Sequence, residues 1–69
     1  MAHKFEVGQR YLVKEKKKYM AAAREIKVLE ISPSGERVKF LYPQGAEVWE
    51  VIVDYEILEK LSEQKGGVK

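Results

Sequence analysis

Apolar and polar side chains alternate along most of this chain, which is the pattern of β-strands that bury one face. In residues 36–42 the side chains of Val38, Phe40 and Tyr42 share one face, while Arg, Lys and Leu occupy the positions between them. This segment is therefore predicted to form a strand with one face toward water.

The next alternating segment, residues 47–53, holds the single tryptophan of the chain. Trp49 falls in phase with the valines that follow it, so we expect it in the core, opposite Phe40 or Val38 on the adjacent strand. We also expect this strand to be the more deeply buried of the two. An exposed Trp would instead suggest an anchor for a partner, but the in-phase valines favour the core position.

Turn residues separate the predicted strands. Pro43 and Gly45 in YPQGAE predict a hairpin with a loop of about four residues. SPSGE carries Pro and Gly at similar turn positions, so residues 24–31 are predicted to pair with residues 36–42. The three strands then form an antiparallel meander.

The alternation slips inside residues 24–31. Ile26 and Val28 fall on one face, whereas Leu29 and Ile31 fall on the other. A β-bulge near Val28 or Leu29 would bring all four side chains toward one core and bend the strand. We expect such a bulge here.

Each end of the domain adds one element. Residues 9–15 alternate and predict a first strand at an edge of the sheet. Asp54 can cap a helix, and Tyr55, Leu58 and Leu61 follow at helical spacing. A short C-terminal helix that covers one open end of the barrel is therefore predicted.

Together these elements predict one all-β domain over residues 4–64, a curled antiparallel sheet of four to five strands with a short C-terminal helix. Residues 65–69, KGGVK, are expected to form a disordered tail, because paired glycines stop a helix and leave nothing to pack.

Length and composition narrow the class of protein further. A chain of 69 residues has a thin core, since a domain of this size buries only about 60% of its unfolded surface. We expect a monomer or a weak homodimer. The chain has no cysteine and one histidine, His3, which excludes disulfides and cysteine-ligated zinc. No cofactor or metal is expected.

The first dozen residues lack the apolar run of a signal peptide, and no later run has the length that crosses a bilayer. We therefore expect a cytoplasmic protein without a membrane partner.

The net charge of +2 is distributed unevenly. Residues 1–27 hold eight Lys or Arg against three Glu, whereas residues 28–69 hold five against eight acidic residues. The first part is thus +5 and the second −3, which predicts a dipolar molecule rather than a uniformly basic nucleic-acid binder.

The basic excess is concentrated in residues 14–24, KEKKKYMAAAR. Its cations can contact phosphates while Tyr19 stacks on a base. The alternative interpretation is a solvated loop whose lysines discourage strand addition by another chain, and the acidic second part of the chain favours it. The candidate phosphate-binding residues are Lys14, Lys16, Lys17, Lys18 and Arg24.

Several segments, VGQRYLVK, IKVLEISPSGERVKFLYPQG, VWEVI and EIL, resemble the layout of Tudor-like domains over about residues 7–58. These domains belong to the Src-homology-3-like (SH3-like) small barrels. The resemblance implies an SH3-like barrel and a non-catalytic binding module, often with an aromatic cage for methylated lysine or arginine. By position, Tyr11, Tyr19, Phe40 and Tyr42 correspond to the cage rings.

The chain departs from that family pattern in two places. An Asp-Tyr-Gly-Asn turn is replaced by the sequence YPQG, which lacks an acid or Asn to orient a cationic guest, and the first loop carries lysines instead of Trp. The resemblance therefore supports the fold better than the cage. Grooves between the loops of such barrels also bind peptides through exposed rings. The candidate partner-binding residues are Tyr11, Tyr19, Tyr42 and Tyr55.

Catalysis has the least support in the sequence. With no Cys, His only at position 3 and the single Asp assigned to a helix cap, an acid–base pair would need Glu and Lys alone. We expect a non-enzymatic module that docks a protein partner through barrel loops and a strand edge. Weak electrostatic nucleic-acid binding through residues 14–24 is the alternative, and self-association through an unpaired edge is a third option.

Overall fold

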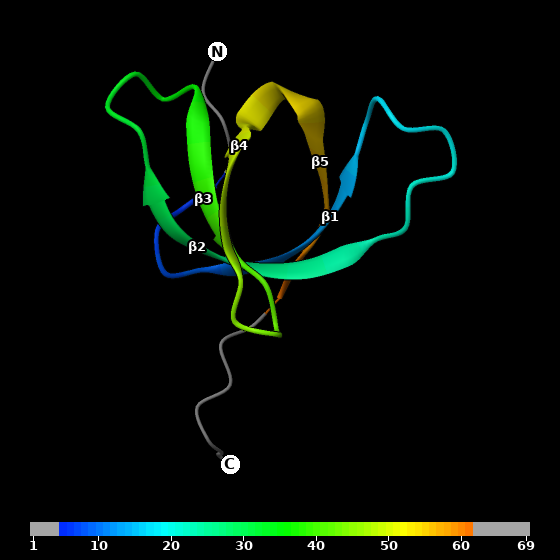
Figure 1. The fold of residues 1–69 in the computed structure, drawn as a ribbon, viewed down its shortest axis with the longest axis horizontal. Helices are drawn as coiled ribbons and strands as arrows, with labels where there is room; N and C mark the ends of the chain where they lie inside the picture. Colours follow the sequence, from blue (N-terminus) through cyan, green and yellow to red (C-terminus); the bar gives the residue numbers. More distant parts are fainter. Residues whose placement is uncertain (1–4, 62–69) are drawn as a thin grey trace.

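The computed structural model describes residues 5–61. These residues form five antiparallel strands and one 3-10 turn (Figure 1). The strands lie in the spatial order β4-β3-β2-β1-β5. The all-β class and the β2–β3–β4 meander are confirmed. The expected tail over residues 65–69 and His3 lie outside the described residues. The elements are β1 (Arg10–Glu15), β2 (Arg24–Ile31), β3 (Arg37–Leu41), β4 (Glu47–Val51), η1 (Ile52–Asp54) and β5 (Tyr55–Leu61).

The sheet is strongly curled, and its two end strands do not pair with each other. The three-residue turn η1 connects β4 directly to β5, so the chain passes from one end of the sheet to the other in a single short step (Figure 1). The architecture is compatible with a small barrel-like fold that is open between β4 and β5.

Both hairpin turns of the meander use the same local chemistry. The Gly35 N–H donates to the Ser32 carbonyl, and the Gly45 N–H donates to the Tyr42 carbonyl, each at 2.8 Å. Both glycines have positive φ angles, +78° and +100°. Glycine adopts such angles at little conformational cost, whereas residues with a Cβ atom adopt them at a higher cost. A proline occupies the second position of each turn, and its ring fixes the φ angle that this position needs. The turn chemistry predicted from the sequence is thus present at both places.

The predicted β-bulge lies in β2. Val28 pairs with Phe40 and Glu30 pairs with Lys39, so the register of the β2–β3 ladder skips Leu29. This shift lets Ile31 follow Val28 onto the inner face, where it packs against the core. Leu29 is the extra residue of the bulge and is half-buried.

Side chains on the inner face of the curled sheet form one core. Phe40, which is fully buried, contacts Phe5 and Tyr55 with ring centroids 5.5 Å and 5.2 Å apart. Tyr11 meets Phe5 edge to face at 5.1 Å. Aromatic pairs in such geometries add to the stabilisation from area burial. The buried residues are Phe5, Tyr11, Val13, Ile26, Val28, Val38, Phe40 and Ile52.

The expected C-terminal helix is wrong, because residues 55–61 form β5 and pair with β1 from Glu15↔Tyr55 to Arg10↔Leu61. β1 is therefore an interior strand and not the expected edge. The apolar residues of this segment fit both a strand and a helix. Tyr55 and Ile57 alternate as in a strand, whereas Tyr55, Leu58 and Leu61 recur at helical spacing. Pairing along the whole of β1 selects the strand over the helix. A register shift in this ladder leaves Leu58 without a partner on β1, and its side chain is exposed.

The expected burial of Trp49 is also wrong. The Tyr42 N–H donates to the Ala46 carbonyl at 2.9 Å and closes the turn so that Phe40 lies opposite Val48 and Lys39 opposite Trp49. Trp49 consequently points to the outer face and is 41% exposed. Both faces of residues 47–53 carry bulky apolar side chains, so the turn sets which face is buried.

This register makes β4 the more exposed strand of the hairpin, contrary to expectation. Ile52, which the alternation placed opposite Trp49, supplies the buried side chain of this segment.

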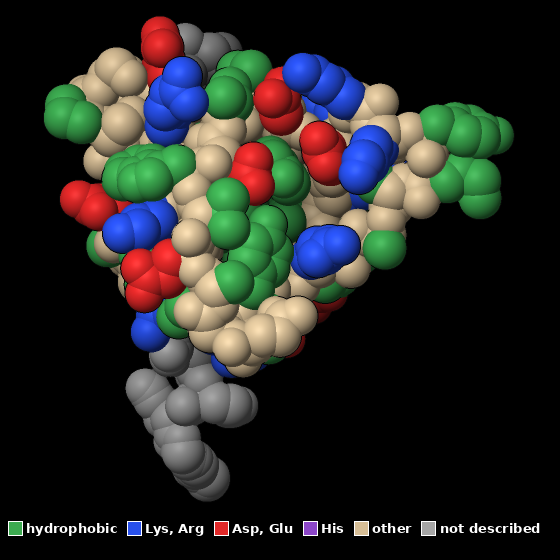
Figure 2. All heavy atoms as spheres, viewed as in Figure 1, with side chains coloured by type: hydrophobic (Ala, Val, Ile, Leu, Met, Phe, Trp, Pro, Cys, Tyr) green, Lys and Arg blue, Asp and Glu red, His purple; other side chains and the backbone are tan. Residues whose placement is uncertain are grey.

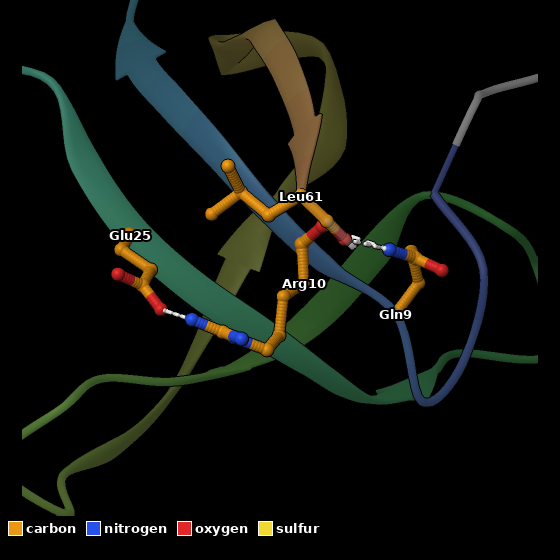
Figure 3. A network of polar contacts seen from close by, with 4 residues as sticks. All are labelled: Gln9, Arg10, Glu25 and Leu61. Atoms are coloured by element: carbon orange, nitrogen blue, oxygen red, sulfur yellow. Dashed lines mark hydrogen bonds and ion pairs between the residues drawn. The ribbon is translucent and has the colours of Figure 1, made fainter. Parts of the chain in front are cut away.

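Side-chain contacts fasten β5 to the start of β1 (Figure 3). The Gln9 amide donates to the carbonyls of Leu61 and Arg10. Arg10 in turn forms an ion pair with Glu25 on β2. Three neighbouring strands are therefore joined at this end of the sheet.

Candidate functional site

A pocket of about 280 Å³ lies between the loop that joins β1 to β2 and the neighbouring ends of β3 and β5. Three of its lining residues are tyrosines from three separate segments of the chain, and we call it the tyrosine pocket. Its charged and aromatic lining residues are Glu15, Lys18, Tyr19, Arg24, Tyr42 and Tyr55.

Two tyrosines are held by the core. Tyr42 follows the last residue of β3 and Tyr55 opens β5, and both rings meet Phe40 edge to face. Their hydroxyl groups are hydrogen-bonded to each other. Either hydroxyl can donate in this bond, because a phenol is both donor and acceptor. These rings form a fixed wall of the pocket.

The environment keeps both phenols protonated. Burial is the main reason that the pKa of Tyr42 is raised above its ordinary value, and the charge of Glu50 raises it further. The pKa of Tyr55 is raised more strongly by the same two causes, with Glu15 contributing. The hydroxyls therefore remain hydrogen-bond donors and acceptors in neutral solution.

Cationic side chains stand beside this wall. The guanidinium carbon of Arg24, at the start of β2, lies 5.9 Å from the centre of the Tyr42 ring, within the range of a cation–π contact. Lys18 is exposed on the loop and also lines the pocket. With Glu15 and Glu50 acting on the tyrosines, the pocket combines aromatic surface with charges of both signs.

The loop over residues 16–23 is attached to the body at its first residues. The Lys16 N–H donates to the Asp54 carbonyl at 2.8 Å, and the Lys17 ammonium lies 3.6 Å from the Asp54 carboxylate. Asp54 therefore anchors the loop rather than capping a helix. An exposed ion pair of this kind contributes at most about 1 kcal/mol, so the backbone hydrogen bond is the firmer attachment.

Apolar side chains stand at the far end of this loop. Tyr19 is 93% exposed and Met20 is 80% exposed, and Figure 2 shows hydrophobic side chains projecting from the body at the loop tip. Met20 has a φ angle of +66°, a left-handed conformation that is uncommon for residues with a Cβ atom. The loop thus presents an aromatic ring to solvent beside the fixed pair Tyr42 and Tyr55.

The structure brings together three of the four predicted partner-binding residues, Tyr19, Tyr42 and Tyr55. The fourth, Tyr11, is a core residue with 2% exposure, and its hydroxyl accepts a hydrogen bond from the Glu6 N–H at 2.8 Å. The strand alternation of residues 9–15 already pairs Tyr11 with Val13 on one face. This alternation is the sequence signal that indicates the burial of Tyr11.

The structure places two of the predicted phosphate-binding residues at the tyrosine pocket. Lys18 and Arg24 line the tyrosine pocket, whereas Lys14 lies on β1 opposite Glu56 and Lys17 pairs with Asp54. Positive and negative side chains are interspersed on the face shown in Figure 2. This arrangement resembles a mixed surface more than a phosphate track.

Sequence reasoning missed the two carboxylates that act on the tyrosines. Glu15 ends β1 and Glu50 lies on the inner side of β4, opposite Val38. Only the strand register brings Glu50 near the pocket, so no local motif could have identified it.

Within residues 5–61, no group of three or more His, Cys, Asp or Glu side chains could hold a metal ion. No helix in this described part of the chain is long and apolar enough to span a bilayer.

Comparison of the chain with protein-family models, curated proteins and solved structures finds no match. The geometry of the structure is therefore the basis for a function. It defines a small all-β domain with an open, curled five-stranded sheet and an aromatic pocket beside a basic loop.

Proposed function

We propose that this protein is a non-enzymatic interaction module that docks a protein partner through the tyrosine pocket. The observation that carries the proposal is the convergence of Tyr19, Tyr42 and Tyr55, from three segments, on one pocket next to Arg24. Rings with polar tips are favoured at interfaces because they supply apolar area and a hydrogen-bonding group together.

The likeness to Tudor-like and SH3-like domains belongs to the same proposal. In those domains grooves between loops receive segments of other proteins, and the tyrosine pocket lies between a loop and two strand ends. β4 ends the sheet in the described part of the chain, and its Glu50 acts on both Tyr42 and Tyr55. An extended partner segment can therefore use the β4 edge while one side chain enters the pocket.

Nucleic-acid binding through residues 14–24 is the competing proposal. Lys18, Arg24 and Tyr19 around one pocket support it, since cations beside a ring suit a stacked nucleotide. Glu15 at the pocket, Glu50 acting on both of its fixed tyrosines and the Lys17–Asp54 pair weigh against it. We favour a protein segment for this reason.

The test is selection of a random displayed peptide library on the immobilised protein, followed by affinity measurement with single variants. Tyr19→Ser removes a ring that is 93% exposed and leaves the core untouched. We expect it to weaken selected peptides about tenfold, equivalent to ~1.4 kcal/mol. Val7→Ser, at a residue 63% exposed and outside the pocket, is the matched control and should change nothing.

Two outcomes would overturn the proposal: no peptide enriched above background, or peptides that bind wild type and Tyr19→Ser equally. A single-stranded oligonucleotide is tested in parallel. Binding that is centred on residues 16–24 and collapses as salt rises would establish the nucleic-acid alternative instead.

A further inference from the structure

The outer face of β2, β3 and β4 is a second surface, separate from the tyrosine pocket. Cross-strand pairs place Glu30 opposite Lys39 and Lys39 opposite Trp49, so the three side chains form a row across the strands. The Lys39 ammonium lies 5.9 Å from the centre of the indole ring and 3.4 Å from the Glu47 carboxylate. We call this surface the Trp49 face.

A groove of about 520 Å³ adjoins the ring on this face and is lined by Glu30, Ile31, Pro33, Arg37 and Trp49, together with a serine. The proline and the indole supply apolar lining, while the Ile31 side chain packs against the core. Such a combination of an exposed large ring with a neighbouring apolar hollow is typical of an interface.

The charges on the Trp49 face are balanced but incompletely paired. Lys39 and Glu47 form an ion pair with each other. Glu30 and Arg37 line the groove and are exposed, and neither is in an ion pair with any other residue of the described range 5–61. Among the described residues, one carboxylate and one guanidinium of this face are therefore without an ion-pair partner.

From this pattern we propose that the Trp49 face is the interface of a homodimer. A surface with one unpaired negative and one unpaired positive group is complementary to itself under two-fold symmetry, because each group meets its opposite on the second copy. Glu30 of one chain pairs with Arg37 of the other, twice, and each indole packs against the groove of its neighbour. A partner of a single charge sign would leave one of the two groups unpaired.

A dimer interface on this face would add buried apolar surface to a domain whose own core is small. Covering a 41% exposed Trp removes apolar surface that a lone domain leaves in water. The inference goes beyond the proposed function and uses none of the pocket residues, so either can fail without the other.

The test is sedimentation equilibrium of the full chain over a range of concentrations at low salt. The wild-type mass should rise from the 8.0 kDa of one chain toward twice that value, and the melting temperature should rise with concentration. Glu30→Arg and Arg37→Glu, each alone, place like charges across the interface and should weaken dimerisation tenfold or more.

Mixing the two single variants supplies the decisive control. A chain with Glu30→Arg offers two positive groups and a chain with Arg37→Glu offers two negative groups, so the mixture should form a heterodimer although each variant alone is monomeric. Both changes are on the surface, and unchanged circular dichroism spectra verify the fold. A monomeric wild type, single variants that dimerise as tightly as the wild type, or a mixture that dimerises no better than the single variants would each overturn the proposal.

Discussion

The hydroxyls of Tyr55 and Tyr42 are hydrogen-bonded to each other and so join the first residue of β5 to the residue after β3. β3 and β5 are not neighbours in the sheet. The bond therefore links two strands that no ladder connects, and both rings also pack on Phe40. One wall of the tyrosine pocket is thus part of the core, while Tyr19 lines the pocket from the exposed loop.

A double-mutant cycle measures that link. Tyr55→Phe and Tyr42→Phe each remove one hydroxyl of the pair, while both keep the rings on Phe40. Each change should lower the free energy of unfolding by about 0.5–1.5 kcal/mol. The double variant should lose less than the sum of the single losses, because the bond is lost only once. Strictly additive losses in urea unfolding would show that the hydroxyls do not interact.

Alkaline pH should destabilise the fold. The pKa values of Tyr11, Tyr42 and Tyr55 are raised above 10.0 in the folded state, chiefly by burial. Above pH 10 the folded chain therefore binds more protons than the unfolded chain, and the free energy of unfolding falls as pH rises. Below that pH this contribution is fully present.

The measurement for this prediction is urea unfolding from neutral pH to about pH 12. Tyr55→Phe removes the group with the strongest shift and should flatten the alkaline decline relative to wild type. An equally steep decline in this variant would contradict the assignment.

Alanine substitutions test the strand register. Phe40→Ala empties a fully buried site and should cost about 3–5 kcal/mol. Trp49→Ala should cost about 1 kcal/mol or less at concentrations where the chain is monomeric, because the indole lies on the outer face. Similar large losses for both variants would place the tryptophan in the core and contradict the register.

The backbone at Met20 offers a test of the loop. Because its φ angle is +66°, Met20→Gly should relieve a conformational cost of about 1–2 kcal/mol, partly offset by the entropy of glycine. Met20→Ala removes the same side chain and keeps the Cβ atom, so it is the matched control. The Gly variant should be more stable than the Ala variant by about 0.5–1 kcal/mol. Equal stability would argue against the left-handed conformation.

The sequence allowed the meander to be predicted because its turns and bulge have local causes. Pro and Gly at matching positions fixed both hairpins, and the slip of alternation at Leu29 marked the bulge. The C-terminal strand could not be predicted in the same way. Tyr55, Leu58 and Leu61 satisfy a helical period, and only pairing with the distant β1 selects the extended form.

The site was predictable to a similar degree. Tyr19, Tyr42 and Tyr55 were recognised as rings near loops, and the structure places all three at one pocket. Trp49 was assigned to the wrong face, since both faces of its strand are apolar and the length of the preceding turn decides between them. Glu50 lies near the tyrosine pocket only because of the same strand register, which the sequence did not reveal.

The most direct test of the tyrosine pocket as a docking site is an amide-shift titration of isotope-labelled protein with a peptide selected on the wild type. The account predicts that shifts concentrate at Tyr19, Arg24, Tyr42 and Tyr55, and that Tyr19→Ser suppresses them. Shifts that instead cluster around Trp49, or that persist unchanged in Tyr19→Ser, would contradict it.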